Sequence, residues 1–110
     1  MKTKIYLKWE IPTNIVLIVK SICADYERRA KVIALAKADG AVIEKYKELN
    51  DAIDKALEDV EPGIRKSLLN DFVEHLGYDR SGATFILSKN AYYRRKRKMI
   101  RDIAHYLNLI

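Results

Sequence analysis

The segment SKNAYYRRKRKMIRDIA, residues 88–104, decides how the C-terminal part of this chain folds. Ser88 is of a residue type that favours helix N-caps, and the residues after it predict a helix to about Leu107. Apolar side chains recur on one face of that helix, namely Tyr92, Met99, Ile100, Ile103, Ala104 and Leu107. Because such a stripe must be buried, we expect it to anchor the helix, while the basic first half faces solvent.

The positive charge of the chain is concentrated in its last third. The formal net charge is +6 over 110 residues. Residues 1–77 hold 13 basic and 13 acidic residues, whereas residues 78–110 hold eight basic and two acidic ones. This asymmetry indicates a polyanionic partner at one end of the molecule, although a basic run alone is also typical of an ordinary solvated helix face.

The composition favours a single soluble, helix-rich domain. Apolar residues make up 49% of the chain and charged residues 33%, with four glycines and two prolines. The longest apolar run, residues 15–19, is far shorter than the roughly 20 residues that a membrane span needs, so we expect no membrane partner. Cys23 is the single cysteine and cannot build a disulfide framework, which predicts a cytoplasmic location.

Upstream of residue 61 the sequence predicts long amphipathic helices. Apolar residues recur every three or four positions from about residue 13 towards Gly40, and again over residues 41–60. Gly40 is the expected C-terminal cap or break between the two helices. These helices can pack as a hairpin within the chain or form a dimer surface. Residues 2–10 alternate polar and apolar side chains, which indicates a strand or an extended arm.

Downstream of this region the sequence predicts three further helices joined by short links. The first begins at Pro62 and ends at Gly77. The second is a short helix over about residues 79–86, with Asp79 or Ser81 as its cap. The third is the helix that follows Ser88. We therefore predict an all-α protein in which residues 1–60 serve packing or self-association and residues 61–110 form a helix-turn-helix module.

Three aromatic residues near these links are predicted to fill the small core of that module. They are Tyr78, Phe85 and Tyr106.

The segment ILSKNAYYRRKRKMIRDIA, residues 86–104, resembles the end of the RinA/ArpU-like phage and prophage transcriptional regulators. Their C-terminal module is similar to region four of sigma-seventy-type sigma factors. In that module a Ser or Thr caps the recognition helix, a polar pair follows, and a basic run leads into an apolar tail. Here Ser88 is the cap, Lys89 and Asn90 are the polar pair, and residues 100–104 are the tail. Ile86 stands where the family commonly has a glycine in the turn.

The resemblance implies a sequence-specific DNA-binding regulator, expected to act on phage or prophage late genes in the cytoplasm of a bacterial host, at the nucleoid. Double-stranded DNA is the implied partner, and RNA polymerase is a candidate second partner. The resemblance places base reading on Lys89, Asn90, Tyr93 and Arg94, and phosphate contacts on Arg97, Lys98 and Arg101. For Tyr93, packing against the preceding helix is the alternative to a contact with DNA. Asn can pair bidentately with adenine and Arg with guanine, each contributing about 1–3 kcal/mol of discrimination.

Other function classes have less support or remain as alternatives. His75 and His105 are far apart in sequence, and the chain has no Gly-rich phosphate loop, HExxH or CxxC motif. We therefore expect no enzyme activity, no cofactor and no metal. A basic helix does not distinguish DNA from RNA, so RNA binding stays open. The rival class is a protein-interaction module, and we expect a homodimer formed through residues 12–60.

Overall fold

The computed structural model describes residues 11–110, and this part of the chain is all-helical, without a strand. Its elements are α2 (Thr13–Ala24), α3 (Tyr26–Leu35), α4 (Gly40–Leu57), the 3₁₀ turn η1 (Pro62–Ile64), α5 (Arg65–Glu74), α6 (Gly77–Arg80) and α7 (Lys89–Tyr106). The all-α prediction is confirmed. The strand or arm predicted for residues 2–10 lies outside the described residues.

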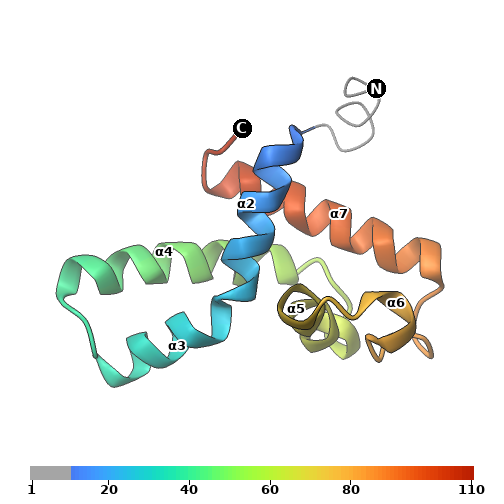
Figure 1. The fold of residues 1–110 in the computed structure, drawn as a ribbon, viewed down its shortest axis with the longest axis horizontal. Coiled ribbons are helices and arrows are strands. Elements are labelled where there is room, and N and C mark those ends of the chain that lie inside the picture. Colours follow the sequence, from blue (N-terminus) through green and yellow to red (C-terminus); the bar gives the residue numbers. More distant parts are fainter. Residues whose placement is uncertain (1–10) are drawn as a thin grey trace.

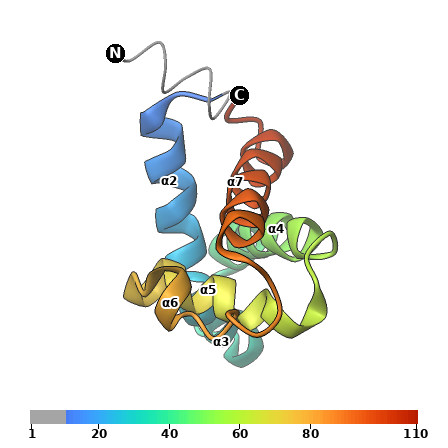
Figure 2. The same ribbon diagram turned by 90° about the vertical axis from the view of Figure 1, so that its right-hand side faces the viewer.

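Helix α2 is central to the arrangement, because it contacts both α5 and α7. Figure 2 shows α2 and α7 side by side, with α5 and α6 at their foot. Helices α3 and α4 form a hairpin on the other side of the molecule, and α4 also contacts α7 (Figure 1). The helices before residue 61 thus pack within the chain.

Buried apolar side chains from four helices form one hydrophobic core. The members from these helices are Val16, Val19 and Cys23 of α2, Ala52, Ile53, Ala56 and Leu57 of α4, Leu68 and Phe72 of α5, and Tyr92, Met99, Ile100, Ile103 and Ala104 of α7. Residues from both sides of the predicted boundary at residues 60/61 therefore share this core.

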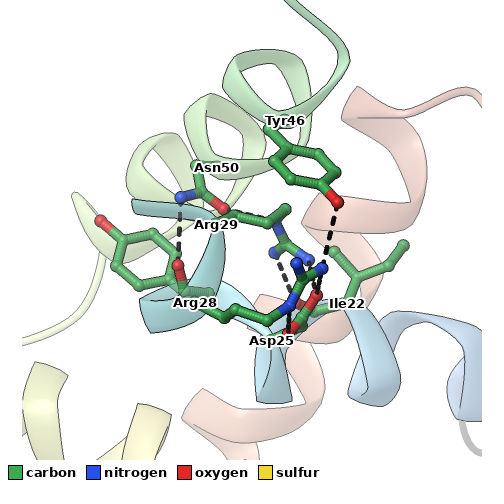
Figure 3. A network of polar contacts seen from close by, with 7 residues as sticks. Ile22, Asp25, Arg28, Arg29, Tyr46 and Asn50 are labelled. Atoms are coloured by element: carbon green, nitrogen blue, oxygen red, sulfur yellow. Dashed lines mark hydrogen bonds and ion pairs between the residues drawn. The ribbon is translucent and has the colours of Figure 1, made fainter. Parts of the chain in front are cut away.

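The first long helix of the prediction is divided at Asp25, where the backbone leaves the helical conformation (φ −97°, ψ 8°). The buried Arg29 guanidinium, which is 3% exposed, donates to the carbonyl of Ile22 at the end of α2 and to the side chain of Asn50 in α4 (Figure 3). Arg29 thus ties the α2–α3 corner to α4. One continuous helix was the wrong prediction, because this corner is fixed by a residue distant in sequence.

The link between α3 and α4 also differs from the prediction. The left-handed position that ends α3 is taken by Ala36 (φ 51°), not by Gly40. Gly40 is instead the first residue of α4, and the Asp39 carboxylate caps this helix by accepting from the Val42 N–H. The N-cap preference of Asp explains why the helix begins here.

The short helix predicted over residues 79–86 is wrong in position and length. Helix α5 ends at Glu74, three residues before the predicted end, and α6 spans only Gly77–Arg80. Ser81 then bends the chain, because its hydroxyl donates to the Tyr78 carbonyl at 2.7 Å and accepts from the Ala83 N–H at 3.1 Å. Gly82 follows with φ 90°, a conformation that favours glycine and stops a helix.

The three aromatic residues expected in the core have different environments. Tyr78 packs against the core. Tyr106 is 38% exposed, with the Lys55 ammonium 4.5 Å from the centre of its ring. Phe85 is fully exposed, so its predicted burial is wrong. The reason is that the 81–88 segment is a loop and not an amphipathic helix.

We expect residues 61–110 not to fold as an isolated fragment, because α5 and α7 would lose α2 and α4, the helices that cover their apolar faces. Circular dichroism should show a largely unfolded fragment, whereas the full chain should unfold cooperatively on heating. Cooperative thermal unfolding of the fragment at a similar temperature would contradict this expectation.

Candidate nucleic-acid interface

Helix α7 begins as the sequence predicts. The Ser88 hydroxyl accepts a hydrogen bond from the Ala91 N–H at 3.2 Å, which satisfies one of the free donors at the start of the helix. Five of the six residues of the predicted apolar stripe are buried, and the sixth, Leu107, is half-buried just beyond the end of the helix. The side chains of Tyr92, Met99, Ile100, Ile103 and Ala104 are at most 1% exposed. The helix is therefore anchored along one face, and its opposite face is fixed in direction.

The buried carboxylate of Asp71 connects α5 to both α6 and α7. One of its oxygens accepts from the Tyr92 hydroxyl at 2.6 Å and from the Lys96 ammonium at 3.0 Å. The other accepts from the Gly77 N–H at 2.9 Å. Asp71 is 2% exposed, so these three donors replace the water that a free carboxylate would bind. The first half of α7 is thereby held against α5.

The same contacts set the ionisation of the carboxyl. Burial by itself would raise the pKa of Asp71, but the hydrogen bonds from Tyr92, Gly77 and Lys96 outweigh it and hold the pKa below its usual value. Burial, with the hydrogen bond to Asp71, raises the pKa of the Tyr92 phenol. Asp71 is thus an anion that accepts from a neutral phenol and from a cation.

Two further basic residues of α7 make ion pairs with acids that precede α5. The Arg95 guanidinium makes a forked contact with Glu61, with N–O distances of 2.9 and 2.8 Å. This contact lowers the pKa of the Glu61 carboxyl. The Lys98 ammonium lies 3.0 Å from Asp59 and 2.7 Å from Asp102. Three members of the basic run, counting Lys96, therefore bind acidic residues of the same chain.

The sequence did not identify these three acidic partners as part of the site. Asp59, Glu61 and Asp71 lie 25 to 39 residues before the bases that they bind. In the sequence these acids are marked only by a charge opposite to that of the bases. Opposite charge alone does not show which acid pairs with which base.

The face of α7 that points away from the core carries four of the remaining predicted residues. Asn90, Arg94, Arg97 and Arg101 recur at intervals of four, three and four, so they form one stripe along the helix. Lys89, Asn90 and Arg94 are exposed, while Arg97 and Arg101 are half-buried. Within residues 11–110, the side chains of Lys89, Asn90, Arg94 and Arg97 have no hydrogen bond or ion pair.

Tyr93, which was predicted to reach DNA, is held by a contact within the chain. Its phenol oxygen accepts from the Tyr78 N–H at 3.2 Å, and its ring meets the Tyr92 ring edge to face with centroids 5.3 Å apart. The side chain is half-buried. Tyr93 and Lys98 are thus predicted site residues whose polar atoms already contact other parts of this chain.

Residues 11–110 offer little support for a metal site, a reactive cysteine or a membrane-spanning helix. No group of three or more His, Cys, Asp or Glu side chains in this range is placed to hold a metal ion. The Cys23 thiol is 1% exposed, and burial raises its pKa to about 12, which disfavours the reactive thiolate. Among the same residues, no helix is both long enough and apolar enough to cross a membrane.

Comparisons with known proteins provide no relative for this chain: no family model, no curated protein and no solved structure matches it.

We expect Asp71→Asn to destabilise the fold by about 3 kcal/mol, because it leaves the Lys96 ammonium without its counter-charge in a site that is only 15% exposed. Adding Lys96→Met should recover part of that loss, since the two residues interact directly. Urea unfolding of the two single variants and the double variant measures this coupling.

Asp59→Asn is the matched control for that experiment. It removes the same charge from an exposed ion pair with Lys98, where we expect a loss of at most about 1 kcal/mol. Equal losses for Asp71→Asn and Asp59→Asn would show that the buried carboxylate has no special role.

Proposed function

We propose that this protein binds double-stranded DNA through the outer face of α7 and regulates transcription. The observation that carries the proposal is the stripe of Asn90, Arg94, Arg97 and Arg101 on the side of α7 opposite its buried face. A helix fits the major groove of B-DNA, and arginines along its outer face can contact both base edges and phosphates.

The position of each residue on the stripe suggests its role. Asn90 and Arg94 are one turn apart near the start of α7, and both are exposed, so they can reach neighbouring bases. Asn suits adenine and Arg suits guanine. Arg97 lies one turn further along, where a phosphate contact adds affinity without discrimination between sequences. Lys89 adds a further exposed cation at the first position of the helix.

We infer that α7 acts as the reading helix without a long preceding helix. A helix-turn-helix joins its two helices by a turn of about three or four residues. Here α6 is a single turn, and residues 81–88 separate it from α7. In that motif the preceding helix supports the reading helix. Here the contacts of Asp71 and the buried apolar stripe provide this support instead. Regulation of phage or prophage late genes, implied by the resemblance of residues 86–104, is part of the same proposal.

A second candidate function, a protein-interaction module, is favoured by two exposed apolar residues of α2. Leu17 is 59% exposed and Ile18 is 43% exposed, although both belong to a helix whose other face is in the core. These two neighbouring side chains are open to contact with another protein, including a second copy of this chain. A homodimer is compatible with the DNA proposal, because two reading helices could bind two half-sites.

The DNA proposal predicts different effects for substitutions along the stripe. Asn90→Ala or Arg94→Ala should reduce discrimination between duplexes by about 1–3 kcal/mol. Arg97→Ala should weaken binding to all duplexes alike and lower the slope of log affinity against log salt by about one. Selection from random duplexes, followed by fluorescence anisotropy at two salt concentrations, measures both effects.

Lys47→Ala is the matched control, since it removes one exposed positive charge from α4, away from the stripe. Duplex affinity that is insensitive to salt and to all three α7 substitutions would reject the DNA proposal and leave the interaction module as the better account.

A further inference from the structure

Phe85 is the most exposed large apolar side chain in the described residues, with its full surface open to solvent. Burying a phenylalanine side chain is worth roughly 1.5–3 kcal/mol. The fold forgoes this stabilisation at Phe85, although Ala83 and Leu87 on either side pack inward. A fully exposed aromatic between two inward-facing residues is open to contact with a partner.

The loop that carries Phe85 is held by several hydrogen bonds. The Tyr78 hydroxyl donates to the Leu87 carbonyl at 2.6 Å and approaches the Thr84 carbonyl at 3.5 Å. The N–H groups of Ile86 and Leu87 both donate to the Ala83 carbonyl, at 2.9 and 3.0 Å. The backbone on both sides of Phe85 is therefore held in place, and little backbone freedom remains to be lost when a partner binds.

This loop is coupled to the anchor of α7. The Tyr78 ring meets the Tyr92 ring edge to face, with centroids 5.5 Å apart, and Tyr92 donates to Asp71. The loop leads directly into the first turn of α7, as Figures 1 and 2 show. Phe85 is thus displayed at the end of α7 that bears Lys89 and Asn90.

The charges near Phe85 in sequence favour an anionic partner with flat apolar groups. Arg80 and Lys89 on either side of the loop are exposed, against one exposed acid, Asp79. Nucleic acid combines phosphates with flat base faces, and stacking of a base on an aromatic ring contributes about 1–3 kcal/mol. An anionic membrane fits less well, because the only other large exposed apolar residue of the loop, Ile86, already lies against Gly63.

We propose that Phe85 stacks on a nucleobase of the nucleic acid that α7 binds. The inference rests on the proposed function, the binding of DNA by α7. It extends that function by a contact to the face of a base, which is hidden in an intact duplex. The accessible base can come from a single strand, where aromatic residues form stacking platforms, or from a duplex step that the ring opens as a wedge.

Tryptophan fluorescence tests the contact directly. The chain has one tryptophan, so Trp9→Phe/Phe85→Trp places the only indole at the loop tip. Stacking should quench its emission when an oligodeoxythymidine strand or a mixed-sequence duplex is added, and the two probes separate a single-strand platform from a duplex wedge. Trp9→Phe/Leu35→Trp is the matched control, since Leu35 is 61% exposed on α3, and its emission should not change.

Affinity supplies the second measurement. Phe85→Ala should weaken binding of the quenching probe by roughly tenfold, the loss of one stacked base, and should not affect thermal stability because Phe85 makes no core contact.

Salt-dependent duplex binding with no quenching and no effect of Phe85→Ala would overturn the stacking contact and leave the proposed function intact. Absence of binding to both probes would overturn both. A blue shift on phosphatidylglycerol vesicles without quenching by either probe would assign Phe85 to a membrane and overturn the inference.

Discussion

The position of α7 depends on one buried anion, the carboxylate of Asp71 in α5. It binds a phenol and an ammonium of α7 and the backbone N–H at the start of α6. A buried carboxylate without such donors would be strongly unfavourable, so the three groups have to meet at this point. Together with the buried apolar stripe, this requirement fixes the rotation of α7 about its own axis. It therefore fixes which residues of the basic run face outward.

The basic run divides into two sets with different roles. Arg95, Lys96 and Lys98 are bound by acids of the same chain and help to seat the helix. Asn90, Arg94, Arg97 and Arg101 lie on the side of α7 opposite its buried apolar stripe. Under the proposed function, the first set orients the second towards DNA. The count of eight basic residues in residues 78–110 overstates the number of cations that are open to a polyanion, because three of them are bound by acids of the same chain.

The features that the sequence predicted correctly are local ones. The Ser88 cap and the buried stripe from Tyr92 to Ala104 follow from residue type and helical spacing within a single element. The all-α class follows from the same periodicity over the rest of the described chain. Such patterns do not need knowledge of what packs on the helix.

The features that the sequence did not predict depend on contacts between distant residues. The corner at Asp25 is fixed by Arg29, whose guanidinium donates to the side chain of Asn50, 21 residues after Arg29 in the chain. The short α6 follows from the side-chain turn at Ser81 and the positive φ of Gly82, which overrode the apolar spacing of residues 83–87. For the candidate site, the outward stripe was predictable, whereas its support by Asp71 was not.

A carboxyl titration of Asp71 followed by carbon-13 NMR tests this account most directly. Because the pKa of Asp71 is lowered in the folded protein, its stabilisation is present above the unfolded value of about 3.9 and is lost as the pH falls through the folded value. The account predicts a midpoint below that of an aspartate in the unfolded chain, accompanied by loss of the packing between α5 and α7. An ordinary midpoint in a protein that stays folded, with the Tyr92 signals unchanged, would contradict it.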